Sequence, residues 1–249
     1  MLELLRDAYA TIRGYARRHR ALYALVRLVK FGPFVGWRNE RIRTRLIAEG
    51  REKGWRMLNL GSGGRYERQM VNLDVTPVTG PDVVGDGFAL PFAAGAFDLV
   101  VCDYVIEHVP DPDRFLRALG TVLRPGGTAY LAVPFLQPGH GAPHDYTRWT
   151  RQGFQLFAER AGFDVCASDV HLGAAFTLFW VLKESLAATT GLGIPSFVAM
   201  LRYLWSWLLC PLLVLDLIVP PMFRCDALAS GYYFVLAARH APQPGGGPR

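Results

Sequence analysis

A glycine-rich turn and two acidic residues downstream of it have the types and spacing to hold a nucleoside. The apolar run Met57–Leu60 leads into Gly61-Ser62-Gly63-Gly64, where the missing Cβ atoms let the backbone approach a ligand closely. A second apolar run ends in Asp74, whose carboxylate is able to accept two hydrogen bonds from a ribose diol. Asp86 follows in the run Gly85-Asp86-Gly87-Phe88. Because glycine-rich loops occur in many unrelated proteins, the context of this turn decides what it means.

A second group of polar residues follows the apolar run that ends at Val133. It comprises His140 and the run His144-Asp145-Tyr146-Thr147-Arg148-Trp149. Imidazole and carboxylate groups act as general bases, so His144 or Asp145, and after them His140, are the candidates to deprotonate an acceptor hydroxyl. Arg148 could hold an anionic group such as phosphate or carboxylate. The same residues could equally form a structural network in which Asp145 and Arg148 are an ion pair.

The elements that must position these residues follow Gly54. Short apolar runs alternate there with helical stretches, which is typical of a mostly parallel α/β sheet. The predicted strands are Arg56–Leu60, Val71–Val75, Asp82–Val84, Phe97–Cys102, Thr128–Val133, Phe163–Val170 and Tyr232–Ala238. Helices are predicted over Pro112–Leu123 and Arg151–Ala161. The glycine-rich turn and Asp74 therefore each follow a strand.

Taken in order, these motifs resemble the class I methyltransferases that use S-adenosylmethionine (SAM), specifically the small-molecule branch typified by ubiquinone-biosynthesis-like enzymes. The resemblance covers residues 56–170 and continues in residues 230–240. Glu107-His108-Val109 and Leu123-Arg124-Pro125-Gly126-Gly127 complete the pattern. The resemblance implies a Rossmann-like, seven-stranded, mostly parallel sheet with helices on both faces, and SAM as the cofactor. It also implies that the loop after the fifth strand faces the transferred methyl group.

The resemblance assigns roles to individual residues of this chain. Gly61 and Gly63 would line the methionine part of SAM, Asp74 would hold the ribose hydroxyls, and Asp86 would face the adenine amine. Asp103 would lie near the sulfonium or amino-acid end of the cofactor. The full expected cofactor site is Asn59, Gly61, Ser62, Gly63, Asp74, Asp86, Gly87, Phe88 and Asp103.

Two residues depart from the family pattern. Asn59 stands where an acid is usual, and Arg65 stands where a third glycine often occurs. The stretch between Gly61 and Asp74 is also short, which implies a truncated first helix. These departures put the contact to the cofactor's ammonium group in doubt. A nicotinamide-binding site is disfavoured, because Tyr66 occupies the last glycine position of its Gly-x-Gly-x-x-Gly motif.

Basic residues are concentrated before the first predicted strand. Residues 1–56 hold fourteen Lys and Arg against five Asp and Glu, a net charge of +9, whereas the whole chain carries +6. Apolar residues recur at helical spacing over Leu2–Val29, Phe31-Gly32-Pro33 interrupts them, and a second basic helix is predicted over Trp37–Glu52. This segment is either a helical lid with solvated arginines or an interfacial helix that favours anionic lipid.

An apolar insertion, Leu172–Ser230, separates the last two predicted strands. Its core, Leu204–Phe223, is twenty residues long with Asp216 as its only charge, and at about 1.5 Å per residue it would reach about 30 Å, the thickness of a bilayer core. Three prolines interrupt it: Pro211, Pro220 and Pro221. If both flanking strands belong to one sheet, an odd number of membrane crossings is excluded. We favour helices that lie in or re-enter the membrane interface over a buried helical cap or a true span.

The sequence thus predicts five segments and a location. They are a basic helical arm (1–54), a SAM-binding Rossmann-like domain (55–171), an apolar helical insertion (172–230), the last strand of the domain (231–240) and a disordered Pro/Gly-rich tail (241–249). The four cysteines show no CxxC spacing, which argues against a zinc site and fits a reducing compartment. The first thirty residues lack the continuous apolar stretch of a secretory signal. We therefore expect a cytoplasmic protein at the inner face of the membrane.

The predicted function is methyl transfer to a small or lipid-linked acceptor, with oxygen preferred because of the His and Asp residues around His144. Two other classes stay open. One is a non-catalytic, membrane-associated scaffold with this fold. The other is a nucleic-acid methyltransferase, which the basic arm would suit. It is disfavoured because Tyr9, Tyr15 and Tyr23 lie on the apolar face of the predicted helix, where bases would not stack on them.

Overall fold

The computed structural model describes residues 40–63, 65–141, 144–218 and 225–239. Most of the predicted basic arm, the end of the Leu204–Phe223 segment and the predicted tail lie outside these residues. The chain divides into two compact units. One contains residues 43–133, 141–169 and 233–249, and the other contains residues 1–42, 134–140 and 170–232.

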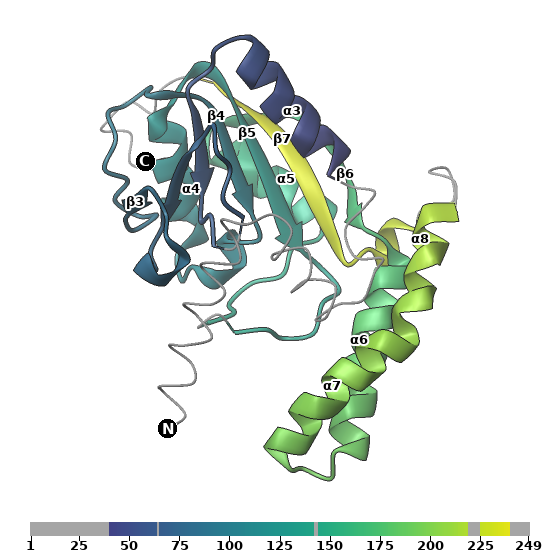
Figure 1. The fold of residues 1–249 in the computed structure, drawn as a ribbon. Helices are drawn as coiled ribbons and strands as arrows, with labels where there is room; N and C mark the ends of the chain where they lie inside the picture. The colour runs from purple at the N-terminus through teal and green to yellow at the C-terminus, as the bar shows by residue number, and fades with distance from the viewer. Residues whose placement is uncertain (1–39, 64, 142–143, 219–224, 240–249) are drawn as a thin grey trace, which may run out of the picture. The chain divides into compact units, whose positions relative to one another are not determined.

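A seven-stranded sheet forms the framework of the fold. Its strands are β1 (Met57–Leu60), β2 (Val71–Asp74), β3 (Val83–Val84), β4 (Phe97–Asp103), β5 (Leu123–Pro134), β6 (Phe163–Leu172) and β7 (Gly231–Ala238). Their order is β3-β2-β1-β4-β5-β7-β6, and the pairings that join β3, β2, β1, β4 and β5 are parallel. This confirms the predicted α/β sheet (Figure 1).

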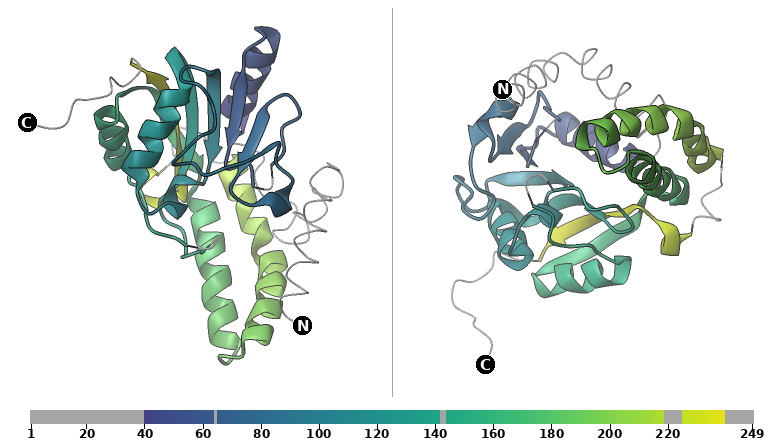
Figure 2. Two further views of the ribbon diagram at one scale, coloured as in Figure 1. Left: turned by 90° about the vertical axis from the view of Figure 1, so that its left-hand side faces the viewer. Right: turned by 90° about the horizontal axis from the view of Figure 1, so that it is seen from below.

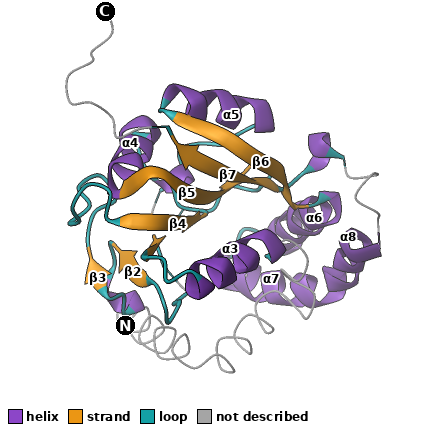
Figure 3. Ribbon diagram, turned by 90° about the horizontal axis from the view of Figure 1, so that it is seen from above, coloured by secondary structure: helices purple, strands orange, loops and turns teal. Residues whose placement is uncertain are grey.

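Burial on both faces explains the composition of the central strands. All four residues of β1 are buried, and Leu99, Val100 and Val101 of β4 have no exposed surface. Continuous apolar runs of this kind are typical of parallel strands that helices cover on both sides. Helices α4 (Pro112–Val122) and α5 (Arg151–Arg160) lie on one face of the sheet, and α3 (Arg41–Glu52) lies on the other (Figure 3).

The link between β1 and β2 contains no helix among its described residues. The sequence had implied a truncated first helix here, and the structure replaces it with turns. Asn72 stabilises this link, because its side-chain amide donates hydrogen bonds to the carbonyls of Glu67 (2.9 Å) and Met70 (3.0 Å). The glycine turn thus follows β1 directly, and the chain then enters β2 at Val71 with only turns among the described residues between them.

The predicted insertion folds as a helical hairpin. Helix α6 (Ala174–Thr190) and helix α7 (Pro195–Leu209) lie side by side, joined by the turn Gly191–Ile194 (Figures 1 and 2). A 3-10 segment, η3 (Cys210–Val214), and a short helix, α8 (Leu215–Ile218), follow. The predicted apolar segment from Leu204 is therefore not one continuous helix. It is interrupted at Pro211, which has no N–H to donate to the preceding turn.

Asp216 has a structural role within this hairpin. Its carboxylate accepts hydrogen bonds from the backbone N–H groups of Ala175 (3.1 Å) and Phe176 (3.0 Å) at the start of α6. A charge that would be costly in a spanning segment thus stabilises a helix N-terminus. Among the described residues, one stretch, Pro195–Val214, is long and apolar enough to cross a membrane, with a mean hydropathy of 1.7, and only 22% of it is buried.

Candidate functional site

The glycine turn at the end of β1 is bonded to the end of β2. Gly61 and Gly63 have φ values of +67° and +44°, in the left-handed region that favours glycine. A Cβ atom on Gly61 would lie 2.4 Å from Val105 Cγ2. The Ser62 N–H donates to the carbonyl of Leu73 (2.9 Å), and the Gly63 N–H donates to Asp74 Oδ2 (2.5 Å). The predicted residues Gly61, Ser62, Gly63 and Asp74 are therefore together.

Asp74 keeps acceptor capacity after it has organised this turn. Its second oxygen, Oδ1, accepts from the Thr76 N–H (2.8 Å), and the residue is 8% exposed. A carboxylate offers about four acceptor positions, and these two bonds use two of them. The remaining positions could accept the two hydroxyls of a ribose.

The two departures from the family pattern are connected in the structure. The Asn59 side-chain amide donates to the carbonyl of Arg65 (2.6 Å) and to Asn72 Oδ1 (2.9 Å). The Arg65 guanidinium in turn pairs with Asp103 (3.0 Å). The arginine that replaces a glycine is thus held at its backbone by Asn59 and at its side chain by Asp103.

Asp103 lies in a cluster of buried charges. Besides Arg65, it accepts from Arg43 Nε (2.7 Å), and Arg43 also donates to Glu67 Oε1 (2.9 Å). Arg43 is 3% exposed and comes from α3. The structure therefore places the predicted residue Asp103 against two arginines. Its predicted position beside the sulfonium group stays a prediction.

Two buried donors in this region have no partner among the described residues. They are Arg43 Nη2 and the Tyr130 hydroxyl. Burial raises the pKa of Tyr130, and the charge of Asp103 raises it further, so its hydroxyl keeps its proton. A buried donor without a partner costs about 1–3 kcal/mol. Both groups could therefore donate a hydrogen bond to a polar ligand or to water near Asp103. The sequence pattern did not point to either residue.

The Asp86 segment forms a tight turn. Asp86 is exposed, and its Oδ1 accepts from the Phe88 N–H (2.9 Å). A Cβ on Gly87 would lie 2.4 Å from Phe115 Cε2, which explains the glycine. The Phe88 ring meets Phe115 edge-on at 6.4 Å, and Arg114 lies 5.3 Å above it. The adenine contacts of Asp86, Gly87 and Phe88 stay predictions.

The predicted base candidates are distributed over both units. His144, Asp145 and Arg148 lie in the sheet unit, whereas His140 belongs to the hairpin unit, 5.4 Å from the ring of Trp180. Asp145 and Arg148 form a bidentate ion pair, with 2.6 Å between Nη2 and Oδ2. The ion pair that the sequence offered as an alternative for Asp145 and Arg148 is therefore present in the fold. A role as general base for His144, Asp145 or His140 stays a prediction.

Glu107 is a buried acid that belongs to the family pattern but received no role from the sequence. It has no exposed surface, and burial raises its pKa to about 8. The Tyr146 N–H donates to its carbonyl (2.8 Å), and His108 Nδ1 lies 2.6 Å from the carbonyl of His144. The loop around His144 therefore runs along Glu107-His108. The sequence signal that could have indicated a buried acid is the position of Glu107 between the apolar residues Ile106 and Val109.

Known proteins resemble this chain in sequence. A family profile described as a methyltransferase domain matches residues 63–131. An uncharacterised methyltransferase of Mycobacterium leprae is 32% identical over 154 residues, which cover 57% of this chain and 52% of that protein. These matches support the predicted class I methyltransferase family. It spans about half the length of the curated relatives that it matches.

Solved structures resemble this chain in fold. Phosphoethanolamine N-methyltransferase 2 of Haemonchus contortus, solved with phosphomonomethylethanolamine and S-adenosylhomocysteine, has a TM-score of 0.50 at 17% identity and covers 88% of this chain and 56% of its own. The [4+2]-cyclase SpnF has a TM-score of 0.51 at 16% identity and covers 92% and 96%. The predicted family and fold are thus confirmed. The fold alone does not define the reaction, and membership of the ubiquinone-like branch stays a prediction.

Proposed function

We propose that this class I methyltransferase transfers a methyl group from SAM to a small or lipid-linked acceptor at the inner face of a membrane, with oxygen as the preferred acceptor atom. The observation that supports this most strongly is the turn Gly61–Gly63. It is bonded to the carboxylate of Asp74, and Arg65 and Asp103 link it to Arg43, whose Nη2 is a buried donor without a partner among the described residues.

The residues present suit SAM chemically. Arg43 Nη2 would take the carboxylate of the methionine part, since a guanidinium with a free donor recognises carboxylates. Asp74 would accept the ribose hydroxyls, and the exposed Asp86 would accept the adenine amine. When bound, SAM supplies a methyl group that is activated by its sulfonium charge. The glycine turn leaves the backbone free to lie against the ligand.

Binding of SAM tests this assignment. In Asp74→Ala the affinity measured by titration calorimetry should fall by about 1.5–3 kcal/mol, the value of a charge-assisted hydrogen bond. Asp164→Ala, which removes an exposed carboxylate on β6, is the matched control and should bind like the wild type. Because Asp74 also accepts from the turn, the melting temperature of each variant is measured in parallel. Equal affinity in a folded Asp74→Ala protein would remove Asp74 from the site.

The acceptor side is proposed to include the loop around His144. His144 is exposed, and its imidazole could take the proton of an acceptor hydroxyl while the oxygen forms its bond to the methyl carbon. Asp145 is bonded to Arg148 and would position the loop. Methyl transfer depends strongly on alignment of acceptor and donor, so a loop that lost its shape would also lower the rate.

Turnover of two variants separates these roles. His144→Ala should lower kcat about 100-fold or more if its imidazole takes the proton. Asp145→Asn should raise KM more than it lowers kcat if Asp145 only positions the loop. Full turnover in a folded His144→Ala protein would refute the base role. The acceptor itself is sought by mass spectrometry of lipid and glycan extracts with and without the gene, as a species that differs by one methylene mass.

The other candidate, a non-catalytic scaffold, predicts a different result in the same titration. Neither SAM nor S-adenosylhomocysteine would bind at physiological concentration. Since SpnF carries a similar fold with a cyclase activity, binding of SAM without methyl transfer to any extract would also favour a function outside methylation.

A further inference from the structure

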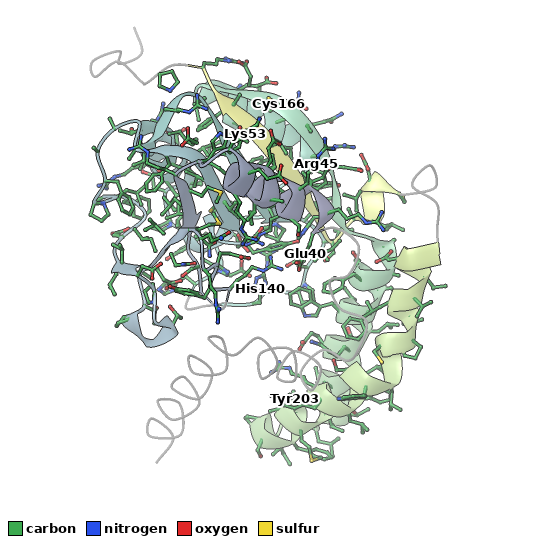
Figure 4. The ribbon with its side chains drawn as sticks, turned by 45° about the horizontal axis from the view of Figure 1, so that its top comes forward. Glu40, Arg45, Lys53, His140, Cys166 and Tyr203 are labelled. Carbon is green, nitrogen blue, oxygen red and sulfur yellow. The ribbon has the colours of Figure 1, made fainter. Side chains whose placement is uncertain are left out.

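The outer surface of the α6–α7 hairpin is apolar and exposed. Figure 4 draws its side chains, with Tyr203 of α7 labelled. Its large apolar residues with more than a third of their surface exposed are Leu178, Val181, Leu192, Ile194, Phe197, Met200, Tyr203, Leu204, Trp207 and Leu208. They belong to both helices and to the turn between them. Large exposed apolar side chains that gather on two packed helices and the turn between them indicate a site of interaction.

The three charged residues of the hairpin form ion pairs with one another. Glu184 pairs with Lys183 (3.0 Å) and with Arg202 (2.7 Å). No charged residue lies between Glu184 and Arg202 in the sequence. The far half of the hairpin, from this ion pair to the turn, therefore carries no charge that needs hydration.

The turn Gly191–Ile194 contains a leucine at a left-handed position, where a turn exposed to water usually has glycine or asparagine. Leu192 has a φ of +51° and is 80% exposed. The left-handed region is unfavourable for leucine, and glycine or asparagine is the usual choice there. Little packing within the described residues offsets this, because Gly193 and Ile194 beside it are also exposed. A large apolar side chain in this position points to apolar surroundings outside the chain.

The depth of the uncharged part fits one leaflet of a bilayer. Thr190 lies six positions after Glu184 on α6, which is a rise of about 9 Å at 1.5 Å per residue. The hydrocarbon half-thickness of a bilayer is about 15 Å. Insertion of the turn and the last helical turns would leave the Glu184–Arg202 pair at the level of the headgroups.

Charge favours a lipid surface over a second copy of the chain. Residues 1–56 carry a net charge of +9, which complements anionic headgroups, whereas it would repel the same segment of another copy. Protein interfaces also have a polar rim, and the turn and its flanks offer no charged residue to form one.

We propose that the α6–α7 hairpin is a monotopic anchor whose turn, Gly191–Ile194, enters one leaflet of an anionic phospholipid bilayer. The start of α6 and the end of α7 then remain on one side of the membrane, which is required because the hairpin connects β6 and β7 of one sheet. This inference deepens the proposed function, on which it rests for the membrane location, and it names the element that makes the contact.

Flotation with vesicles tests the anchor. The full chain, prepared without detergent, is mixed with vesicles of phosphatidylcholine alone or of phosphatidylcholine and phosphatidylglycerol. It should float with both and more strongly with the anionic ones. Leu192→Asp should lower the partition coefficient about tenfold or more, since it removes a leucine that the membrane would bury and adds a charge. Aspartate also accepts the left-handed conformation better than leucine, so the variant should fold.

The matched control is Leu156→Asp on α5, which places the same charge at a leucine that is 48% exposed, and it should float like the wild type. Equal flotation of Leu192→Asp and wild type, or no flotation of the wild type, overturns the proposal. So does a wild-type dimer, seen by light scattering, that Leu192→Asp dissociates. Calorimetry with SAM on the same preparations keeps the two proposals apart, because a protein that floats but does not bind SAM refutes only the methyltransferase.

Discussion

The charged cluster around Asp103 and the α6–α7 hairpin differ in what they bury. The cluster buries Arg43 and pairs it with the partly buried Asp103, whereas the hairpin exposes leucines and pairs its few charges locally. Substitutions in the cluster should therefore destabilise the folded state. Substitutions on the hairpin surface should leave folding intact and act on what the hairpin contacts. The difference separates stability from interaction experimentally.

The largest expected effect is the pH dependence that Glu107 imposes on stability. Burial raises its pKa to about 8, so between pH 4.5 and 8 the folded chain keeps a proton that the unfolded chain has released. Stability then falls with rising pH by about 1.4 kcal/mol per pH unit from this group. Glu107→Gln, which stays neutral, should gain roughly 4 kcal/mol over the wild type between about pH 5 and pH 8.

Urea denaturation at several pH values measures this gain. Glu52→Gln, at an exposed position on α3, is the control and should show a constant difference from the wild type. A constant difference for Glu107→Gln as well would mean that Glu107 ionises normally.

Removal of a buried cation should have the next largest effect. Arg43→Met leaves Glu67 and Asp103 without their shared partner, and breaking a buried pair in this way costs about 3 kcal/mol. Arg45→Met, on the exposed side of the same helix (Figure 4), should change the free energy of unfolding by less than about 0.5 kcal/mol. Equal urea midpoints for the two variants would contradict the charged cluster.

The smallest effect on folding is expected on the hairpin. Met200 is 55% exposed on α7, so Met200→Ser should change stability by less than about 0.5 kcal/mol in the absence of vesicles. Thermal denaturation without lipid measures this. A loss above about 2 kcal/mol would show that another part of the chain covers this face, and the contrast between the two regions would fail.

The strands and the glycine turn were predictable because their signals are local. Met57–Leu60, the glycine turn and Val71–Asp74 carry their structure in apolar runs and in glycines that need positive φ. Arg43, Tyr130 and Glu107 were not identified, because their importance comes from partners far away in the sequence and from burial that no local pattern reports. The Asp145–Arg148 pair was foreseen as one of two alternatives. The sequence could not decide whether Arg148 holds an anionic group of the acceptor or pairs with Asp145, because that depends on the geometry of the loop.

The hairpin shows the same limit. The apolar composition of Leu172–Ser230 predicted helices, but the position of the turn depends on how α6 and α7 pack. Helix α7 begins at Pro195, well before the predicted core at Leu204, because residues 191–194 hold two glycines and end before a proline. Asp216, the only charge in the predicted core, caps the N-terminus of α6.

The most direct test of the account is a crystal structure of the chain with S-adenosylhomocysteine. The account predicts that the ligand's carboxylate lies within hydrogen-bond distance of Arg43 Nη2 and that its ribose hydroxyls donate to Asp74. A ligand bound elsewhere, with Arg43 Nη2 and the Tyr130 hydroxyl satisfied by water alone, would contradict it.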